Sequence, residues 1–383
     1  MIRVPTTKAV ISRLGACAAL LCIAACMAPA VAQSDLRLGA ADTDFSVSLV
    51  SANEFAPHWP PDLEIRLDWP TSCLPVISRT SLDDLHIDVH LHSAISGCAP
   101  ASTPVTLRVN PARESGRNRI ALGIYQVRLF LEQGNGSSEL IGFRLLQSGG
   151  DITLTRPENG FWWSVTASDA VPALAGSGVS IEQQGDDIAV SLLSYEAGSP
   201  VWYFGSATMP GNIARIPLIR MVGGDEPFSS PFSAPGAEPG MSLNLEFLSP
   251  SHANAWLVRP RSEESLALEI QPLSLMRVPF NDEAAGKRFL GEWVLAVEDA
   301  REARVINLTR LITADEETFR LVDRFGSVSL QCRSQQVGGH ASPVFCSLMD
   351  GASVLADFDV VGLDRLSGLD ANGTQVRLVR LPR

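Results

Sequence analysis

The sequence lacks the motifs that mark the common catalytic sites of enzymes. It contains no G-x-S-x-G nucleophile turn, no H-E-x-x-H zinc motif and no glycine-rich phosphate loop. Histidine is scarce: outside one short cluster only His58, His252 and His340 remain, and none lies in a recognisable catalytic frame. We therefore predict no catalytic residue and no cofactor, and a secreted hydrolase is the alternative to a binding function.

The chain also lacks a basic cluster. It carries 42 acidic and 30 basic residues, a formal net charge of −12 at pH 7. Nucleic acids and anionic membrane surfaces are bound by positive charge that faces phosphate groups. The composition therefore argues against both partners, and we interpret the negative charge as a solubilising surface.

No apolar run is long enough to cross a bilayer as a helix. The run at residues 14–25 is short, follows three basic residues and precedes the small-residue site Ala30-Val31-Ala32. This order is typical of a secretory signal peptide, predicted here as residues 1–32. We expect an exported protein, periplasmic or extracellular, with residues 33–43 as a linker. Because Ile23-Ala24-Ala25-Cys26 resembles a lipobox, a lipoprotein anchored at Cys26 is the alternative.

Four cysteines follow the predicted signal peptide, and none has C-x-x-C spacing. An even number of cysteines in an exported chain predicts disulfides rather than a zinc or redox site. The local pairs Cys73–Cys98 and Cys332–Cys346 each fall within one predicted domain.

Short runs that alternate apolar and polar residues follow one another from Phe45 to the end of the chain. Such alternation predicts half-buried strands, and Asn135-Gly136 and Asn372-Gly373 are strong hairpin signals. The fold class is therefore all-β. Boundaries rich in glycine or polar residues divide the chain into predicted domains at 44–148, 151–279 and 288–383.

The first domain, residues 44–148, resembles an immunoglobulin-like sandwich of exported bacterial proteins. The resemblance is carried by TSCLP (71–75), CAPASTP (98–104) and the G-x-Y strand that contains Tyr125. A tyrosine in that place resembles the tyrosine corner of such sandwiches.

The central domain has three short strand-like runs, at residues 179–184, 188–195 and 201–206, with turn residues between them. This pattern predicts an antiparallel meander barrel. The frame G-x-W-W, S-G-x-x-I-E-Q-Q-G and S-Y-E-x-G-x-P-V-W-Y resembles a β-rich domain that recurs in exported proteins of Gram-negative bacteria, over about residues 155–280. That resemblance implies a domain and no catalytic residues.

Both later domains open with G-x-W, at Gly160 and Gly291. In lipocalin-like barrels a G-x-W lies on the first strand, and its tryptophan closes one end of the barrel. The analogy implies a lipocalin- or calycin-like central barrel. Residues 288–383 are expected to form a smaller C-terminal β unit.

One strand-like run places His86, Asp88, His90 and His92 on a single face. Residues two apart lie about 6.6 Å apart along a strand, so His90 and His92 are a weak candidate pair of metal ligands. An amphipathic strand with its polar face in water explains the same pattern. We therefore predict no metal site.

Aromatic residues concentrate in the central domain. Because strand residues alternate, Trp202 and Phe204 should face one side and Tyr203 the other. We expect one group in the core and another accessible at a barrel mouth beneath the loop at 223–240. The candidate ligand-binding residues are Trp162, Trp163, Trp202, Tyr203 and Trp256. The predicted function is an exported, non-enzymatic binding or adhesion module whose partner is a glycan, an envelope protein or another surface component.

Overall fold

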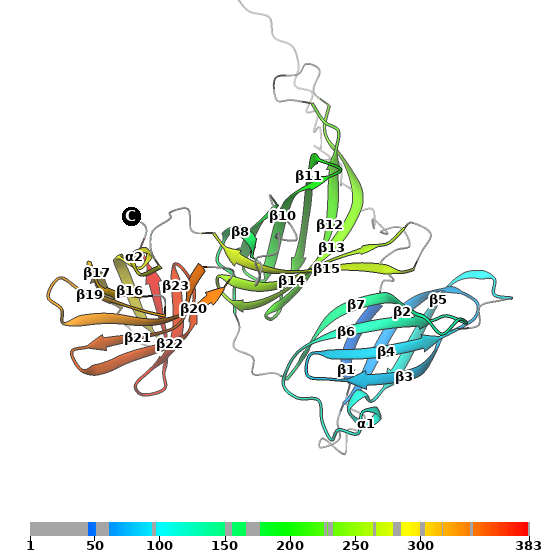
Figure 1. The fold of residues 1–383 in the computed structure, drawn as a ribbon, viewed down its shortest axis with the longest axis horizontal. Coiled ribbons are helices and arrows are strands. Elements are labelled where there is room, and N and C mark those ends of the chain that lie inside the picture. Colours follow the sequence, from blue (N-terminus) through cyan, green and yellow to red (C-terminus); the bar gives the residue numbers. More distant parts are fainter. Residues whose placement is uncertain are drawn as a thin grey trace, which may run out of the picture. The chain divides into compact units, whose positions relative to one another are not determined.

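The computed structural model describes residues 45–50, 61–93, 97–149, 155–165, 177–225, 228, 233–262, 266–278, 285–298, 303–315, 317–337 and 340–381. These residues belong to one unit of contacts, which spans residues 38–383. The predicted signal peptide and linker lie outside the described residues. The expected all-β class is confirmed, because only two four-residue helices, α1 (Pro111–Glu114) and α2 (Ala285–Arg288), accompany 24 strands in the described part of the chain (Figure 1).

The N-terminal region contains two sheets that share one apolar core. A three-stranded sheet has the order β1 (Phe45–Val50), β2 (Asp62–Thr71), β5 (Pro100–Val109). A four-stranded sheet has the order β3 (Val76–Leu82), β4 (His86–His92), β6 (Gly123–Glu132), β7 (Ser138–Ser148). The Tyr125 hydroxyl donates to the Ala121 carbonyl at 3.3 Å, which ties the start of β6 to the preceding loop.

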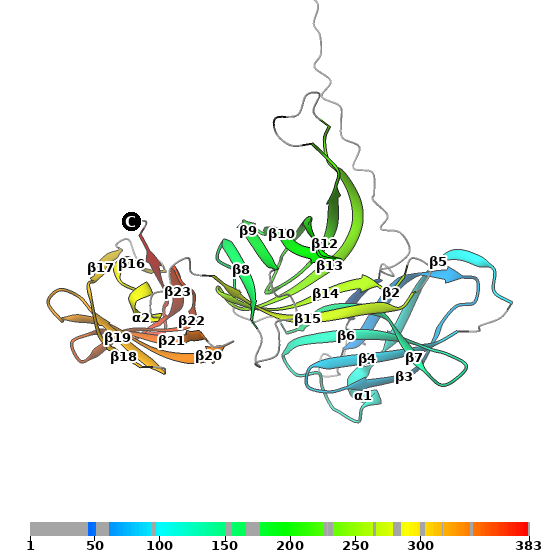
Figure 2. The same cartoon turned by 45° about the horizontal axis from the view of Figure 1, so that its top comes forward.

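The central region is a closed barrel in which each strand pairs with the next and the last pairs with the first. Its strands are β8 (Gly160–Val165), β9 (Gly178–Gln184), β10 (Asp187–Glu196), β11 (Ser199–Thr208), β12 (Ile213–Val222), β13 (Gly236–Ser249), β14 (His252–Pro260) and β15 (Leu268–Arg277). All neighbours are antiparallel, as the predicted meander requires. The ends of β12 and β13 extend as a long hairpin beyond the other strands (Figure 2).

Trp162 packs one end of this barrel. It is fully buried, lies edge-on to Phe247 at 5.9 Å between ring centroids, and donates its indole N–H to the Glu158 carbonyl at 3.3 Å. Arg277 of β15 is the register partner of Trp162 and donates to the Asn159 carbonyl at 3.0 Å. The arginine therefore fastens the last strand to the turn that starts the first.

The C-terminal region repeats the same arrangement. Its nine strands form a sheet curled into a nearly closed barrel, in the order β17, β16, β24, β23, β22, β21, β20, β19, β18 (Figure 2). They are β16 (Gly291–Val297), β17 (Arg304–Leu308), β18 (Arg310–Ala314), β19 (Thr318–Val322), β20 (Val328–Val337), β21 (His340–Asp350), β22 (Ser353–Val361), β23 (Arg365–Asp370) and β24 (Gln375–Arg380). This unit has nine strands, one more than the central barrel, although they are drawn from a shorter stretch of chain.

Trp293 occupies the place of Trp162 in this second barrel. Its indole donates to the Phe289 carbonyl, again four residues earlier, at 2.9 Å. Its register partner is Arg380 of the last strand, which lies over the indole ring and donates to the Leu290 carbonyl at 2.6 Å. In both barrels the glycine two residues before the tryptophan has a φ above +130°, a conformation that side chains disfavour. We call the tryptophan, the opposed arginine and that glycine the clasp.

Replacing the clasp arginine by methionine (Arg380→Met) should lower the free energy of unfolding by about 2–3 kcal/mol, because the variant loses charge-assisted hydrogen bonds and the contact over the indole ring. Urea denaturation of the full chain measures this loss. The matched control is Arg304→Met, which removes a half-exposed ion pair with Asp350 and should cost less than about 1 kcal/mol. Equal losses in the two variants would contradict the role given to Arg380.

Both predicted disulfides are confirmed: Cys73–Cys98 in the N-terminal region and Cys332–Cys346 between β20 and β21. Cys332 and Cys346 are buried in the C-terminal core, whereas Cys73 and Cys98 are partly exposed.

A mild reductant applied to the native protein should therefore open Cys73–Cys98 first, since thiol exchange requires access to a sulfur atom. Alkylation followed by peptide mass mapping should label Cys73 and Cys98 well before Cys332 and Cys346. Simultaneous labelling of all four would show that the C-terminal bridge is not protected by burial.

Candidate functional site

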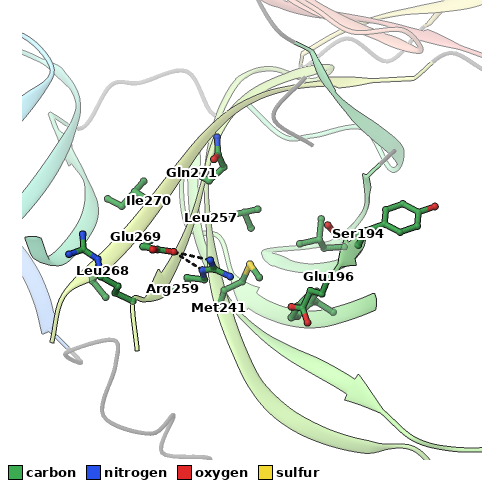
Figure 3. Close-up of a pocket in the computed structure, with 13 residues that line it drawn as sticks. Ser194, Glu196, Met241, Leu257, Arg259, Leu268, Glu269, Ile270 and Gln271 are labelled. Atoms are coloured by element: carbon green, nitrogen blue, oxygen red, sulfur yellow. Dashed lines mark hydrogen bonds and ion pairs between the residues drawn. The ribbon is translucent and has the colours of Figure 1, made fainter. Parts of the chain in front are cut away.

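The central barrel has a pocket of about 560 Å³ at the end opposite Trp162. The C-terminal ends of β10 and β14 and the N-terminal ends of β11, β13 and β15 supply its walls. This position follows from the meander, because alternate strand ends meet at the same rim. The side chains used below are Leu192, Ser194, Tyr195, Glu196, Tyr203, Met241, Leu257, Arg259, Glu269 and Gln271 (Figure 3).

Two hydrogen-bonded networks line this mouth pocket. On β14 and β15, the Arg259 guanidinium holds the Glu269 carboxylate at 2.9 and 3.0 Å. On β10 and β11, the Tyr203 hydroxyl donates to Glu196, whose carboxylate also accepts from Arg220 at 3.2 Å. Figure 3 shows Arg259 and Glu196 on opposite walls, with the Met241 side chain between them.

Apolar side chains form the inner part of the pocket. Leu192 and Leu257 belong to the barrel core and are almost fully buried, and Met241 packs against that core. Beneath them the barrel is filled by buried apolar residues down to Trp162, so that a ligand would reach only the mouth. The pocket therefore offers an apolar floor and a polar, charge-paired rim.

Tyr203 is the most strongly perturbed titrating group of the mouth. Burial, together with the hydrogen bond to the Glu196 carboxylate, raises the pKa of its phenol to about 12. Both effects favour the protonated hydroxyl, because they disfavour a negative oxygen. At neutral pH Tyr203 is thus a hydrogen-bond donor fixed on Glu196.

This shift predicts a stability change at alkaline pH. The unfolded chain releases the phenol proton near pH 10, whereas the folded chain keeps it to about pH 12. The stabilisation is therefore complete below pH 10 and is lost as the pH rises from about 10 to 12, with an amplitude of about 2 kcal/mol. Tyr203→Phe should lack that loss, which urea denaturation at stepped pH would detect. A parallel decline in wild type and variant would contradict the assignment.

The pocket offers little for acid–base or nucleophilic chemistry. The Ser194 hydroxyl is within 3.0 Å of the Ser177 hydroxyl. None of the described residues that line the pocket is a histidine, and both lining carboxylates are engaged by arginine. The arrangement is suited to holding a molecule by hydrogen bonds and apolar contact.

The candidate aromatic residues divide between inside and outside. Trp162, Tyr203 and Trp256 are buried, at 0, 2 and 8% exposure, whereas Trp163 and Trp202 are 36 and 47% exposed. Trp256 lies beside Phe143 at 5.9 Å between ring centroids. Of the five, only Tyr203 lines the mouth pocket. Trp163 and Trp202 lie on the outer wall of the barrel, because the same alternation that turns Tyr203 inward turns Trp202 outward. The exposed ring of Tyr195, by contrast, lines the mouth pocket.

These outer rings form what we call the aromatic face. One row across four strands pairs Trp163, Gly178, Leu193 and Trp202 in register. The next row pairs Phe161, Ser180, Ser191, Phe204 and Ile219. Gly178 and Leu193 stand between the rings of β8 and β11 in the first row, and two serines stand between them in the second. A methyl group on Gly178 would lie 2.0 Å from the ring of Phe161, so glycine is required for that ring to lie flat on the wall.

The histidine strand forms as predicted, with alternating burial along β4. His90 stacks on Phe130 at 4.9 Å, and its Nδ1 lies 3.2 Å from the Arg79 guanidinium and 3.8 Å from the Glu132 carboxylate. Burial, with a contribution from Arg79, lowers the pKa of His90. The described residues contain no group of three metal-ligating side chains, and His90 lies in a stacked, hydrogen-bonded surface network.

A buried cluster around Glu158 has no counterpart in the sequence analysis. Its carboxylate accepts from the backbone N–H groups of Leu363 and Asp364 at 3.0 and 2.7 Å and from Arg277 at 3.1 Å. Burial raises the pKa of Glu158. Asp364 also meets both clasp arginines, Arg277 at 3.0 Å and Arg380 at 3.5 Å. The sequence analysis did not find this cluster, because Glu158 lies some 200 residues from Leu363 and Asp364 in the chain. Its hydrogen-bonded and ion-paired groups indicate a structural role.

Comparison of the chain with family models, curated proteins and solved structures finds no match. The likeness to exported Gram-negative and immunoglobulin-like domains therefore stays a prediction. Within the described residues, no helix has the length and apolar character that a membrane crossing requires.

Proposed function

We propose that this protein is a non-catalytic binding module of the bacterial envelope or the extracellular space, and that its central barrel binds a neutral glycan chain. The observation that carries the proposal is the aromatic face, where rings from β8 and β11 stand exposed in two registered rows.

Exposure of aromatic rings to water is unfavourable, and a partner that covers the rings removes this free-energy cost. Single exposed apolar side chains are ordinary, but a contiguous patch on a water-facing wall is typical of a binding surface. Here Trp202 and Phe204 lie two residues apart on the outer side of β11, and Leu193 lies directly opposite Trp202 on β10. These rings do not contribute to the barrel core, because the inward-facing residues of the strands form that core.

The chemistry of the rows favours a sugar over a charged polymer or a basic protein. No charged residue stands in either row, although the chain as a whole is acidic. Sugar rings present flat C–H faces that stack on aromatic rings, and their hydroxyls can meet the serine hydroxyls between them. An envelope protein that covers the same apolar wall would be the competing partner, and the test below separates the two.

Export is part of the proposal. Two disulfides are consistent with an oxidising compartment. Glycan chains of the envelope and of the surroundings are available in that compartment.

Retention on insoluble polysaccharides tests the proposal. The mature protein should be retained on at least one of cellulose, chitin and purified peptidoglycan, and the double variant Trp202→Ala, Phe204→Ala should be retained at least tenfold less, a loss of about 1.4 kcal/mol. Its melting temperature should change little, because both side chains are more than 40% exposed.

The matched control is Phe325→Ala, which removes a highly exposed ring in the C-terminal region and should leave retention unchanged. Absence of wild-type retention on all three polysaccharides, or equal retention of the double variant, would reject the glycan assignment. Co-purification of an envelope protein lost only in the double variant would point to the competing partner.

A further inference from the structure

The mouth pocket lies beside the aromatic face, and Tyr195 stands between them. Tyr195 lines the pocket and is 57% exposed, and it stands two residues beyond Leu193 on β10, on the same side of the strand. The aromatic face therefore reaches the rim of the pocket. We infer that the mouth pocket is a second, separate site that holds a short neutral saccharide, such as the end of a glycan chain. The inference rests on the proposed function for its ligand class.

Three of the four charged groups that line the pocket are paired within the protein, which favours a neutral ligand. The described residues that line it include two carboxylates, Glu196 and Glu269, and two guanidinium groups, Arg259 and Arg261. Glu269 is held by Arg259, and Glu196 by Arg220 and Tyr203. An ionic ligand would have to compete with these internal pairs, whereas a neutral one can bind with the pairs intact.

The same paired groups retain hydrogen-bonding capacity. A guanidinium has five N–H donors and a carboxylate has about four acceptor sites, and each pair uses only some of them. A carboxylate beside a guanidinium thus offers an acceptor and a donor side by side, which matches two neighbouring hydroxyls of a sugar ring. Arg259 and Glu269 form such a donor–acceptor pair on one wall of the pocket (Figure 3). The other wall offers the Glu196 carboxylate and the Tyr203 hydroxyl oxygen, and Ser194 and Gln271 add neutral groups.

The apolar floor of the pocket suits the C–H groups of a sugar, and the pocket volume suits its size. Leu192, Leu257 and Met241 supply apolar contact for C–H groups, and the ring of Tyr203 lies beside them. A volume of about 560 Å³ is within the range of small-molecule sites. The filled barrel beneath prevents deep entry of a long apolar chain.

Saturation-transfer NMR with three soluble probes, cellobiose, maltose and N,N′-diacetylchitobiose, tests the inference on the full mature chain. At least one should bind the wild type, and the double variant Arg259→Met, Glu269→Met should bind it at least tenfold more weakly. Both side chains are about half exposed, so the fold should tolerate the change. The matched control, Arg304→Met with Asp350→Leu, removes an equally exposed ion pair elsewhere and should bind as wild type does.

The outcomes separate this site from the aromatic face. The variant Trp202→Ala, Phe204→Ala should lose polysaccharide retention and keep disaccharide binding. Retention of polysaccharide without binding of any disaccharide would overturn the pocket assignment and leave the proposed function standing. Unchanged disaccharide binding by the Arg259, Glu269 variant would overturn it too, as would tighter binding of digalacturonate than of every neutral probe. Disaccharide binding without any polysaccharide retention would support the pocket and reject the aromatic face.

Discussion

The pairing of β15 with β8 is the interaction on which the central region depends. It converts an antiparallel meander into a closed barrel, so that every strand has two neighbours and every residue has a defined inside or outside. Arg277 and Trp162 face each other across this seam, and the tryptophan fills the end of the barrel that the seam creates. The mouth pocket lies at the open end of this closed barrel, and the aromatic face lies on its outer wall.

Closure also explains how three consecutive aromatic residues acquire different roles. Trp202, Tyr203 and Phe204 follow one another on β11, yet only Tyr203 turns toward the interior, where its hydroxyl donates to Glu196. The two flanking rings turn outward and meet the rows from β8 and β10. A shift of one residue in register would exchange these roles, burying two large rings and exposing the phenol.

Local patterns in the sequence were sufficient for the strands, the hairpin turns, the two disulfides and the placement of Trp202 and Phe204 on the opposite side of their strand from Tyr203. Those features depend on residues near one another in the chain. The sequence alone did not place Trp163 and Trp202 on the outer wall, because alternation defines opposite sides of a strand and not which of them faces outward. The Glu158 cluster joins residues some 200 positions apart in the chain, and Trp256 is covered partly by Phe143 from another region. Pairing over such separations leaves no local trace.

The rows of the aromatic face have a consequence for the thermodynamics of binding. Their rings stand on strands joined by continuous hydrogen-bond ladders, at the spacing of about 4.8 Å between neighbours that a sheet imposes. A ligand that meets them does not have to order a loop first, and side chains such as tryptophan have few rotamers to lose. The entropic penalty of association is therefore small on the protein side. Affinity depends mainly on how well the ligand fits the fixed positions of the aromatic rings.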